Sequence, residues 1–109
     1  MSDPRTGELL AAASTRRAGS RHWRAVTDPY EPGSTLKPFV AAALLAGHRA
    51  SLSDTVFAEN GEYRRGERLI RDEHEYGTLT LAEVLRYSSN IGMVKLSERL
   101  RPSEHYRYL

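Results

Sequence analysis

The chain has 109 residues, which is enough for one domain or for part of a larger one. Its 16 basic and 14 acidic side chains leave a net charge of +2, too small to indicate binding to nucleic acid or attraction to a membrane surface. The chain has no cysteine, which excludes disulfides and thiolate chemistry, and its four histidines lack metal-ligand spacing, so we expect neither a metal nor a cofactor.

The amino-terminal segment predicts a turn, a strand and a loop. Residues 3–7 have the composition of a tight turn, and the apolar run at 8–14 that follows is typical of a buried strand. Almost nothing precedes this turn, so we expect the chain to begin within a fold, and Met1 opens no targeting segment. Residues 14–27 are basic and irregular, which predicts a solvated loop.

A helix is predicted next, from Ser34 or Thr35 to Gly47. Pro38 has no N–H to donate and would clash inside a helix, so the helix has to begin shortly before it. The apolar run at 39–46 is far short of the roughly 20 residues that a membrane-spanning helix needs. Five apolar positions recur at the spacing of one buried helix face: Leu36, Phe39, Val40, Ala43 and Leu44.

Short strands are predicted in the middle of the chain. Residues 55–57 and 62–71 carry strand-forming side chains and are expected to lie in hairpin connections. Asn60-Gly61 and Gly66 supply the turns, since both are turn-forming signals.

Three helices are predicted in the carboxyl-terminal third. Thr80 and Glu83 match a capping box, in which each side chain bonds the backbone N–H of the other residue, so a helix is expected from Thr80 to about Arg86. A second helix is expected over residues 91–100, and Pro102 is suited to the first turn of a third.

Ser34 and Lys37 stand three residues apart at the predicted start of the first helix, one above the other. Serine becomes a nucleophile when a neighbouring base takes its proton, and a lysine can be that base when burial and the positive end of the helix dipole lower its pKa. Free N–H groups of the first turn could hold the oxyanion that forms. A capping serine beside an exposed lysine is the structural alternative, and the pair alone leaves both open.

A second polar group, Ser88-Ser89-Asn90, lies between two predicted helices. In an extended connection Ser88 and Asn90 would point the same way, because they are two residues apart. One hydroxyl and one amide facing a cleft could relay a proton and bind a substrate amide. The structural alternative is that Ser89 or Asn90 caps the next helix.

Together the two pairs resemble the S-x-x-K and S-x-N motifs of serine β-lactamases and penicillin-binding proteins. "YEPGSTLKPFVAAALL" resembles the nucleophile helix of penicillin-binding protein transpeptidases, and "YGTLTLAEVLRYSSNIGMVKL" resembles their second-motif segment. "DPRTGELLAAAS" is similar to their opening strand hairpin. "FAENGEYRRGERLIRDEHEYG" and the S-S-N-I-G continuation resemble the monofunctional class B members.

The resemblance implies an α+β fold, here the mainly helical part of the penicillin-binding/β-lactamase-like fold with a short strand hairpin and an incomplete antiparallel sheet. Residues 1–109 would be a partial transpeptidase domain that contains the first and second motifs. The third motif, Lys-Thr-Gly, is absent, because the chain's two lysines are Lys37 and Lys95 and Leu96 follows the second. We therefore expect marginal stability and little or no turnover from this chain alone.

The resemblance also implies a role for each motif residue: Ser34 as the acylated nucleophile, Lys37 as its base, Ser88 in the proton relay and Asn90 as a contact of the substrate. The implied reaction is D,D-transpeptidation of peptidoglycan stem peptides that end in D-Ala-D-Ala, with β-lactams as covalent inhibitors. The implied location is the extracytoplasmic face of the bacterial membrane, reached through an anchor absent from this chain. A glycosyltransferase is the partner it suggests for the full-length protein.

Two other functions remain open on the sequence. A penicillin-recognising hydrolase or sensor shares both motifs, and a non-catalytic binding or structural module could keep the same helices. One further polar segment, Asp-Glu-His-Glu at residues 72–75, is interpreted as a solvated acidic loop.

Overall fold

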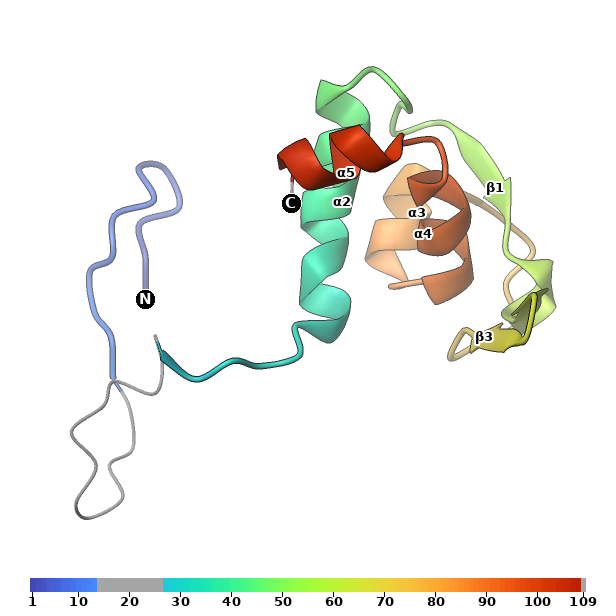
Figure 1. Ribbon diagram of the computed structural model, residues 1–109, viewed down its shortest axis with the longest axis horizontal. Helices are drawn as coiled ribbons and strands as arrows, with labels where there is room; N and C mark the ends of the chain where they lie inside the picture. Colours follow the sequence, from blue (N-terminus) through green and yellow to red (C-terminus); the bar gives the residue numbers. More distant parts are fainter. Residues whose placement is uncertain (14–26, 109) are drawn as a thin grey trace, which may run out of the picture. The chain divides into compact units, whose positions relative to one another are not determined.

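The computed structural model describes residues 1–13 and 27–108, so nearly all of the loop predicted at 14–27 lies outside the described residues. The chain divides into two compact units, residues 1–31 and 32–109. The second unit combines four α-helices with two small antiparallel sheets, which confirms the α+β prediction (Figure 1).

The first unit contains a hairpin turn. The N–H of Asp3 donates to Glu8 O at 2.9 Å, the N–H of Gly7 donates to Asp3 O at 2.8 Å, and one β-bridge joins Ser2 to Leu9. The predicted buried strand is wrong over the described residues 8–13, which are all exposed. Within the described part of this unit, no further strand pairs with the segment to cover its leucines.

The second unit begins with a 3₁₀ turn, η1 (Gly33–Leu36), that continues directly into helix α2 (Lys37–Ala46). Three further helices follow: α3 (Leu81–Arg86), α4 (Asn90–Ser97) and α5 (Pro102–Tyr108). None of the helices in the described residues is long and apolar enough to cross a bilayer.

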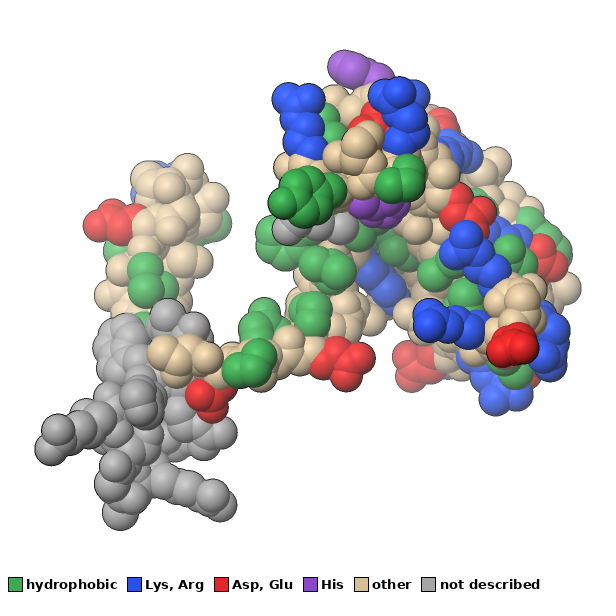
Figure 2. All heavy atoms as spheres, in the orientation of Figure 1, with side chains coloured by type: hydrophobic (Ala, Val, Ile, Leu, Met, Phe, Trp, Pro, Cys, Tyr) green, Lys and Arg blue, Asp and Glu red, His purple; other side chains and the backbone are tan. Residues whose placement is uncertain are grey.

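The helix predicted from Ser34 or Thr35 to Gly47 is present, but its first residues form the 3₁₀ turn η1, α2 itself begins at Lys37, and the buried face differs. Pro38 lies in the first turn of α2 and Gly47 is its C-cap. The predicted buried face is wrong at Leu36 and Phe39, which are 40% and 63% exposed, whereas its other three members are buried. The reason is that α2 packs against α3, α4 and α5 along a side that includes Ala41 instead. Apolar side chains therefore remain on the outer surface along α2 (Figure 2).

The strands form two separate antiparallel pairs. β2 (Glu62–Arg65) and β3 (Arg68–Arg71) make the hairpin predicted around Gly66. The hairpin connection predicted for β1 (Thr55–Phe57) is wrong, because its partner is β4 (Thr78–Thr80). Backbone bonds extend this pairing: the N–H of Ala58 donates to Gly77 O at 2.7 Å, and the short 3₁₀ turn η2 (Glu59–Gly61) follows.

The capping box predicted at the start of α3 is confirmed. Thr80 Oγ1 accepts from the N–H of Glu83 at 3.2 Å, and Glu83 Oε2 accepts from the N–H of Thr80 at 2.8 Å. Both bonds satisfy N–H groups that the helix itself leaves unpaired, which explains why a short helix begins at a defined residue.

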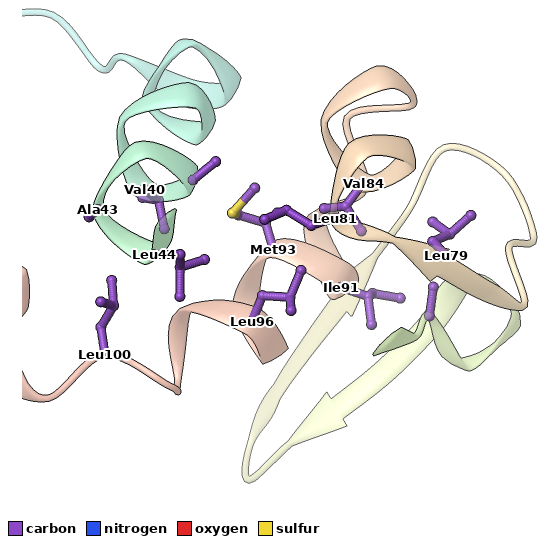
Figure 3. Packing of buried hydrophobic residues seen from close by; sticks show 12 residues of the cluster. Val40, Ala43, Leu44, Leu79, Leu81, Val84, Ile91, Met93, Leu96 and Leu100 are labelled. Carbon is purple, nitrogen blue, oxygen red and sulfur yellow. The ribbon is translucent and has the colours of Figure 1, made fainter. Parts of the chain in front are cut away.

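The hydrophobic core lies between α2, α3 and α4 (Figure 3). Leu44, Leu81, Ile91 and Leu96 have no exposed surface at its centre. Helices α3 and α4 approach closely at Gly92, where an added Cβ would lie 2.5 Å from Val84 Cγ2. A residue without a side chain is therefore required at this crossing.

Helix α5 is held to the residues after α2 by a carboxylate. Glu104 Oε1 accepts from Arg49 Nη2 at 2.6 Å and from Arg49 Nε at 3.1 Å. Its second oxygen accepts from the N–H of Arg101 at 2.7 Å. The bonds from Arg49 and then Arg101 lower the pKa of Glu104 from 4.5 to about 2.

We expect Gly92→Ala to destabilise the second unit. Overpacking costs about 1–3 kcal/mol, and the better helix preference of alanine returns roughly 1 kcal/mol, so the net loss in unfolding free energy is up to about 2 kcal/mol. Denaturant unfolding measures it. Gly77→Ala is the matched control, because a Cβ there meets nothing within 4 Å. Equal stability of the two variants would contradict the close approach at Gly92.

We expect the docking of α5 to weaken in acid. Because the folded-state pKa of Glu104 is lowered from 4.5 to about 2, its contribution to stability is present above pH 4.5 and is lost as the pH falls towards 2. Glu104→Gln should remove this part of the pH dependence. Thermal unfolding of both proteins across that range tests it, with the exposed Glu67→Gln as the control. Parallel pH curves for wild type and Glu104→Gln would argue against the assignment.

Candidate active site

Ser34 lies in an exposed turn at the start of the first helix of the second unit. The turn η1 positions it, and the N–H of Lys37 donates to Ser34 O, so both residues belong to one helical turn as predicted. Lys37 is the first residue of α2 and Pro38 the second. The arrangement exposes the Ser34 hydroxyl at the amino-terminal end of the helix, where the dipole is positive.

The Lys37 ammonium joins the two predicted motifs. Its Nζ donates to Ser88 Oγ at 3.0 Å, to Asn90 Oδ1 at 2.7 Å and to the carbonyl oxygen of Ser88. These residues are more than fifty positions apart in the sequence, so the fold creates the contact. The three acceptors match the three protons of an ammonium group.

The structure therefore brings Lys37, Ser88 and Asn90 into direct contact and places Ser34 in the adjoining turn. Within the described residues, the Ser34 hydroxyl makes no hydrogen bond to the other three side chains. All three donors of the Lys37 ammonium are engaged by Ser88 and Asn90.

Ser88 has a left-handed backbone, with φ of +56°. It follows Tyr87, the C-cap of α3, and its N–H donates to Leu85 O at 3.2 Å, while the N–H of Ser89 donates to Val84 O at 3.0 Å. These two bonds define a Schellman motif, in which glycine usually occupies the left-handed position. A serine there costs about 1–2 kcal/mol of backbone strain. The extended connection predicted for this segment is therefore wrong.

Asp72 holds the residues that follow Ser88. Its Oδ2 accepts from Ser89 Oγ at 2.6 Å, and its Oδ1 accepts from the N–H of Asn90 and from the N–H of Ile91 at 3.0 Å. Ser89 Oγ in turn accepts from the N–H of Gly92 at 2.8 Å, so Ser89 caps α4 as the structural alternative predicted. The same tripeptide therefore caps α4 and supplies the acceptors of the Lys37 ammonium.

The solvated-loop interpretation of residues 72–75 is wrong for Asp72, which is half-buried, and correct for the three exposed residues after it. One sequence feature could have indicated its role: α4 has no acidic residue in its own first turn, where a negative charge is favourable. Asp72 supplies that charge from the end of β3.

Asn90 has a defined amide orientation. Its Nδ2 donates to Arg71 O at 2.8 Å, so its Oδ1 faces the Lys37 ammonium. Because both its oxygen and its nitrogen are hydrogen-bonded, the Asn90 amide has little freedom to rotate. The Arg71 carbonyl of β3 thereby fixes the orientation of Asn90 in the site.

Two opposing effects act on Lys37. Burial, the larger effect, lowers the pKa of Lys37 below its usual 10.5, because a partly desolvated ammonium is less favourable. The negative charge of Asp72 raises the pKa of Lys37 and partly offsets this. The net lowering makes a neutral amine easier to reach than in water.

A hollow lies beside Asp72, and neither Ser34 nor Lys37 lines it. Within the described residues, no group of three or more His, Asp or Glu side chains converges as a metal-ligand set. The hollow is lined by Asn60, Gly61, Glu62, Arg71, Asp72, Glu73, His74 and Glu75.

Comparison with curated proteins finds peptidoglycan enzymes. The chain is 40% identical over 116 residues to the probable peptidoglycan D,D-transpeptidase PenA of Neisseria gonorrhoeae, an alignment that covers 97% of this chain and 20% of PenA. It is 36% identical over 106 residues to the peptidoglycan D,D-transpeptidase FtsI of Escherichia coli K12, covering 87% of this chain and 18% of FtsI. The chain thus spans about a fifth of the length of these relatives.

Solved structures give the same answer. The TP domain of Burkholderia pseudomallei penicillin-binding protein 3 superposes with a TM-score of 0.74 at 37% identity, covering 77% of this chain and 25% of that domain. The family described as penicillin binding protein transpeptidase domain matches residues 1–109. The chain therefore belongs to the penicillin-binding protein transpeptidase domain family, of which it spans a part.

Proposed function

We propose that the protein to which this segment belongs is a peptidoglycan D,D-transpeptidase that works through a serine acyl-enzyme. The observation that carries the proposal is the Lys37 ammonium, which bonds Ser88 and Asn90 and shares a helical turn with Ser34. The names of the relatives support the substrate class, since PenA and FtsI are both described as peptidoglycan D,D-transpeptidases.

In the first half-reaction, Ser34 Oγ forms a bond to the carbonyl carbon of the penultimate D-Ala of a stem peptide. Neutral Lys37 takes the serine proton, and the positive end of the helix dipole favours the oxyanion that forms, since the N–H groups of Thr35 and Lys37 already donate to Pro32 O and Ser34 O. The C–N bond then breaks, and the amine of the leaving D-Ala receives the proton through the Ser88 hydroxyl.

In the second half-reaction, an amine of a neighbouring stem peptide attacks the ester carbonyl. Its proton passes through Lys37 back to Ser34 Oγ as the ester bond breaks, so the enzyme returns to its starting state. A β-lactam acylates the same serine. Asn90 contacts the peptide through the second N–H of its amide, because the first donates to Arg71 O.

The contacts of Lys37 indicate how the relay operates. With three protons, Lys37 donates to all three acceptors and has no lone pair. When it loses one proton, the lone pair can accept from the Ser88 hydroxyl, and the direction of that hydrogen bond reverses. The same 3.0 Å contact therefore serves both protonation states of Lys37.

The location and partner of the full protein follow from this substrate. Peptidoglycan lies outside the cytoplasmic membrane, so we place the active protein on the extracytoplasmic face. New glycan strands have to be polymerised before they are cross-linked, so a glycosyltransferase is the partner we propose.

We also propose that these 109 residues alone turn over slowly. The chain has no Lys-Thr-Gly or Lys-Ser-Gly sequence. In the family, the strand that carries this third motif binds the substrate carboxylate and supplies one oxyanion donor. Removal of one such donor costs on the order of a hundredfold or more in rate.

Penicillin labelling tests the nucleophile. We expect a fluorescent penicillin to acylate Ser34 in a complete domain, made by exchanging the matching segment of the Burkholderia pseudomallei TP domain for residues 1–109. Ser34→Ala should abolish the adduct, which peptide mass spectrometry locates, and the isolated chain should label about a hundredfold more slowly or not at all. The exposed Ser103→Ala is the control. An adduct that persists in Ser34→Ala would overturn the proposal.

The pH dependence of acylation tests the base. We expect the rate to rise with pH and reach its midpoint below 10.5, because burial lowers the pKa of Lys37. Asp72→Asn removes the opposing charge and should move the midpoint to lower pH. Lys37→Arg keeps a cation but cannot deprotonate, so acylation should fall about a hundredfold or more. Full activity of Lys37→Arg would exclude Lys37 as the base.

A further inference from the structure

An aromatic stack lies next to the left-handed residue Ser88. The ring of Tyr87 stacks on that of Tyr76, with centroids 5.3 Å apart and an angle of 15° between the planes. The Arg86 guanidinium lies 5.4 Å from the centroid of the Tyr87 ring. The stack thus joins the last residues of α3 to the segment before β4.

Tyr76 is anchored firmly enough to act as the fixed side of this pair. It packs against the hydrophobic core, and its carbonyl oxygen accepts from the N–H of Asn60 at 2.9 Å. The next residue, Gly77, accepts from the N–H of the fully buried Ala58 at 2.7 Å. His74 contacts the Tyr76 ring edge-on, with centroids 5.9 Å apart. Tyr87, in contrast, is 39% exposed and ends a helix of six residues.

One short segment therefore holds the chain on both sides of Ser88. Asp72 binds the residues after it, through Ser89 Oγ and the N–H groups at the start of α4. Tyr76, four positions further on, stacks on the residue before it. Between these two points the backbone adopts the left-handed conformation that a serine disfavours.

We propose that Tyr76 is a positioning residue of the active site. By stacking on Tyr87, it holds the end of α3 in the left-handed turn that directs the carbonyl and the hydroxyl of Ser88 to Lys37. The catalytic consequence rests on the function proposed for Ser88, whereas the effect on the turn is independent of it. The free energy gained from one aromatic stack is similar to the free energy that a left-handed serine costs. The stack can therefore offset the strain at Ser88.

Amide hydrogen exchange of the complete domain that carries residues 1–109, as made for penicillin labelling, tests this role. The N–H of Ser89 closes the Schellman motif by donating to Val84 O, so its protection reports opening of the turn. We expect Tyr87→Leu to lower that protection by roughly two- to tenfold, and Tyr87→Phe, which keeps the ring, to retain it. The N–H of Gly47, which donates to Ala43 O at the C-cap of α2, is the reference amide outside this turn.

The outcomes separate a local role from a general one. The proposal is supported if Tyr87→Leu lowers the exchange protection of the Ser89 amide but not that of the Gly47 amide. The intraresidue amide–α-proton NOE at Ser88 should also weaken, because the backbone leaves the left-handed conformation. Unchanged Ser89 protection, or an equal fall at both amides, overturns it. Tyr76→Leu removes the same pair from the other side and must give the same pattern. Failure of penicillin labelling at Ser34 with an intact Ser89 response would refute the proposed function and leave this inference standing.

Discussion

The site depends on one constraint: a partly buried ammonium needs an acceptor for each of its three protons. Lys37 is withdrawn from water far enough for its pKa to fall, and a charge in that position is unfavourable unless it is fully hydrogen-bonded. Ser88 and Asn90 provide all three acceptors. The second motif, placed over the start of α2, thus stabilises the charged form of Lys37, which burial disfavours.

Packing in the hydrophobic core positions Ser88 and Asn90 next to Lys37. Leu44 of α2, Leu81 of α3 and Leu96 of α4 are fully buried against one another's helices, so the three helix axes are fixed together. The absence of a side chain at Gly92 lets α4 approach α3 closely, and the turn that joins these helices carries the second motif. The contact between Lys37 and the second motif therefore depends on the packing of core residues that lie outside the site.

Local signals predicted most of the helices and the motif residues. Pro38 and the Thr80 capping box act within one helical turn, so the sequence was sufficient to place both helix starts. Features that depend on distant segments were missed: the β1–β4 pairing, the exposed side of α2 at Phe39, and Asp72, which acts seventeen or more positions from its partners. No periodicity or spacing in the sequence records which of several acidic residues will face a distant helix terminus.

At Ser88, the residue that would give the most stable backbone differs from the residue that can bond Lys37. Glycine adopts that backbone without strain, so selection for thermal stability alone would favour a glycine there. Such a chain would fold better and lose the hydroxyl that bonds Lys37. Stabilising mutations should therefore be kept away from this strained serine, and a glycine at this place in a relative would mark a fold retained without the hydroxyl contact to Lys37.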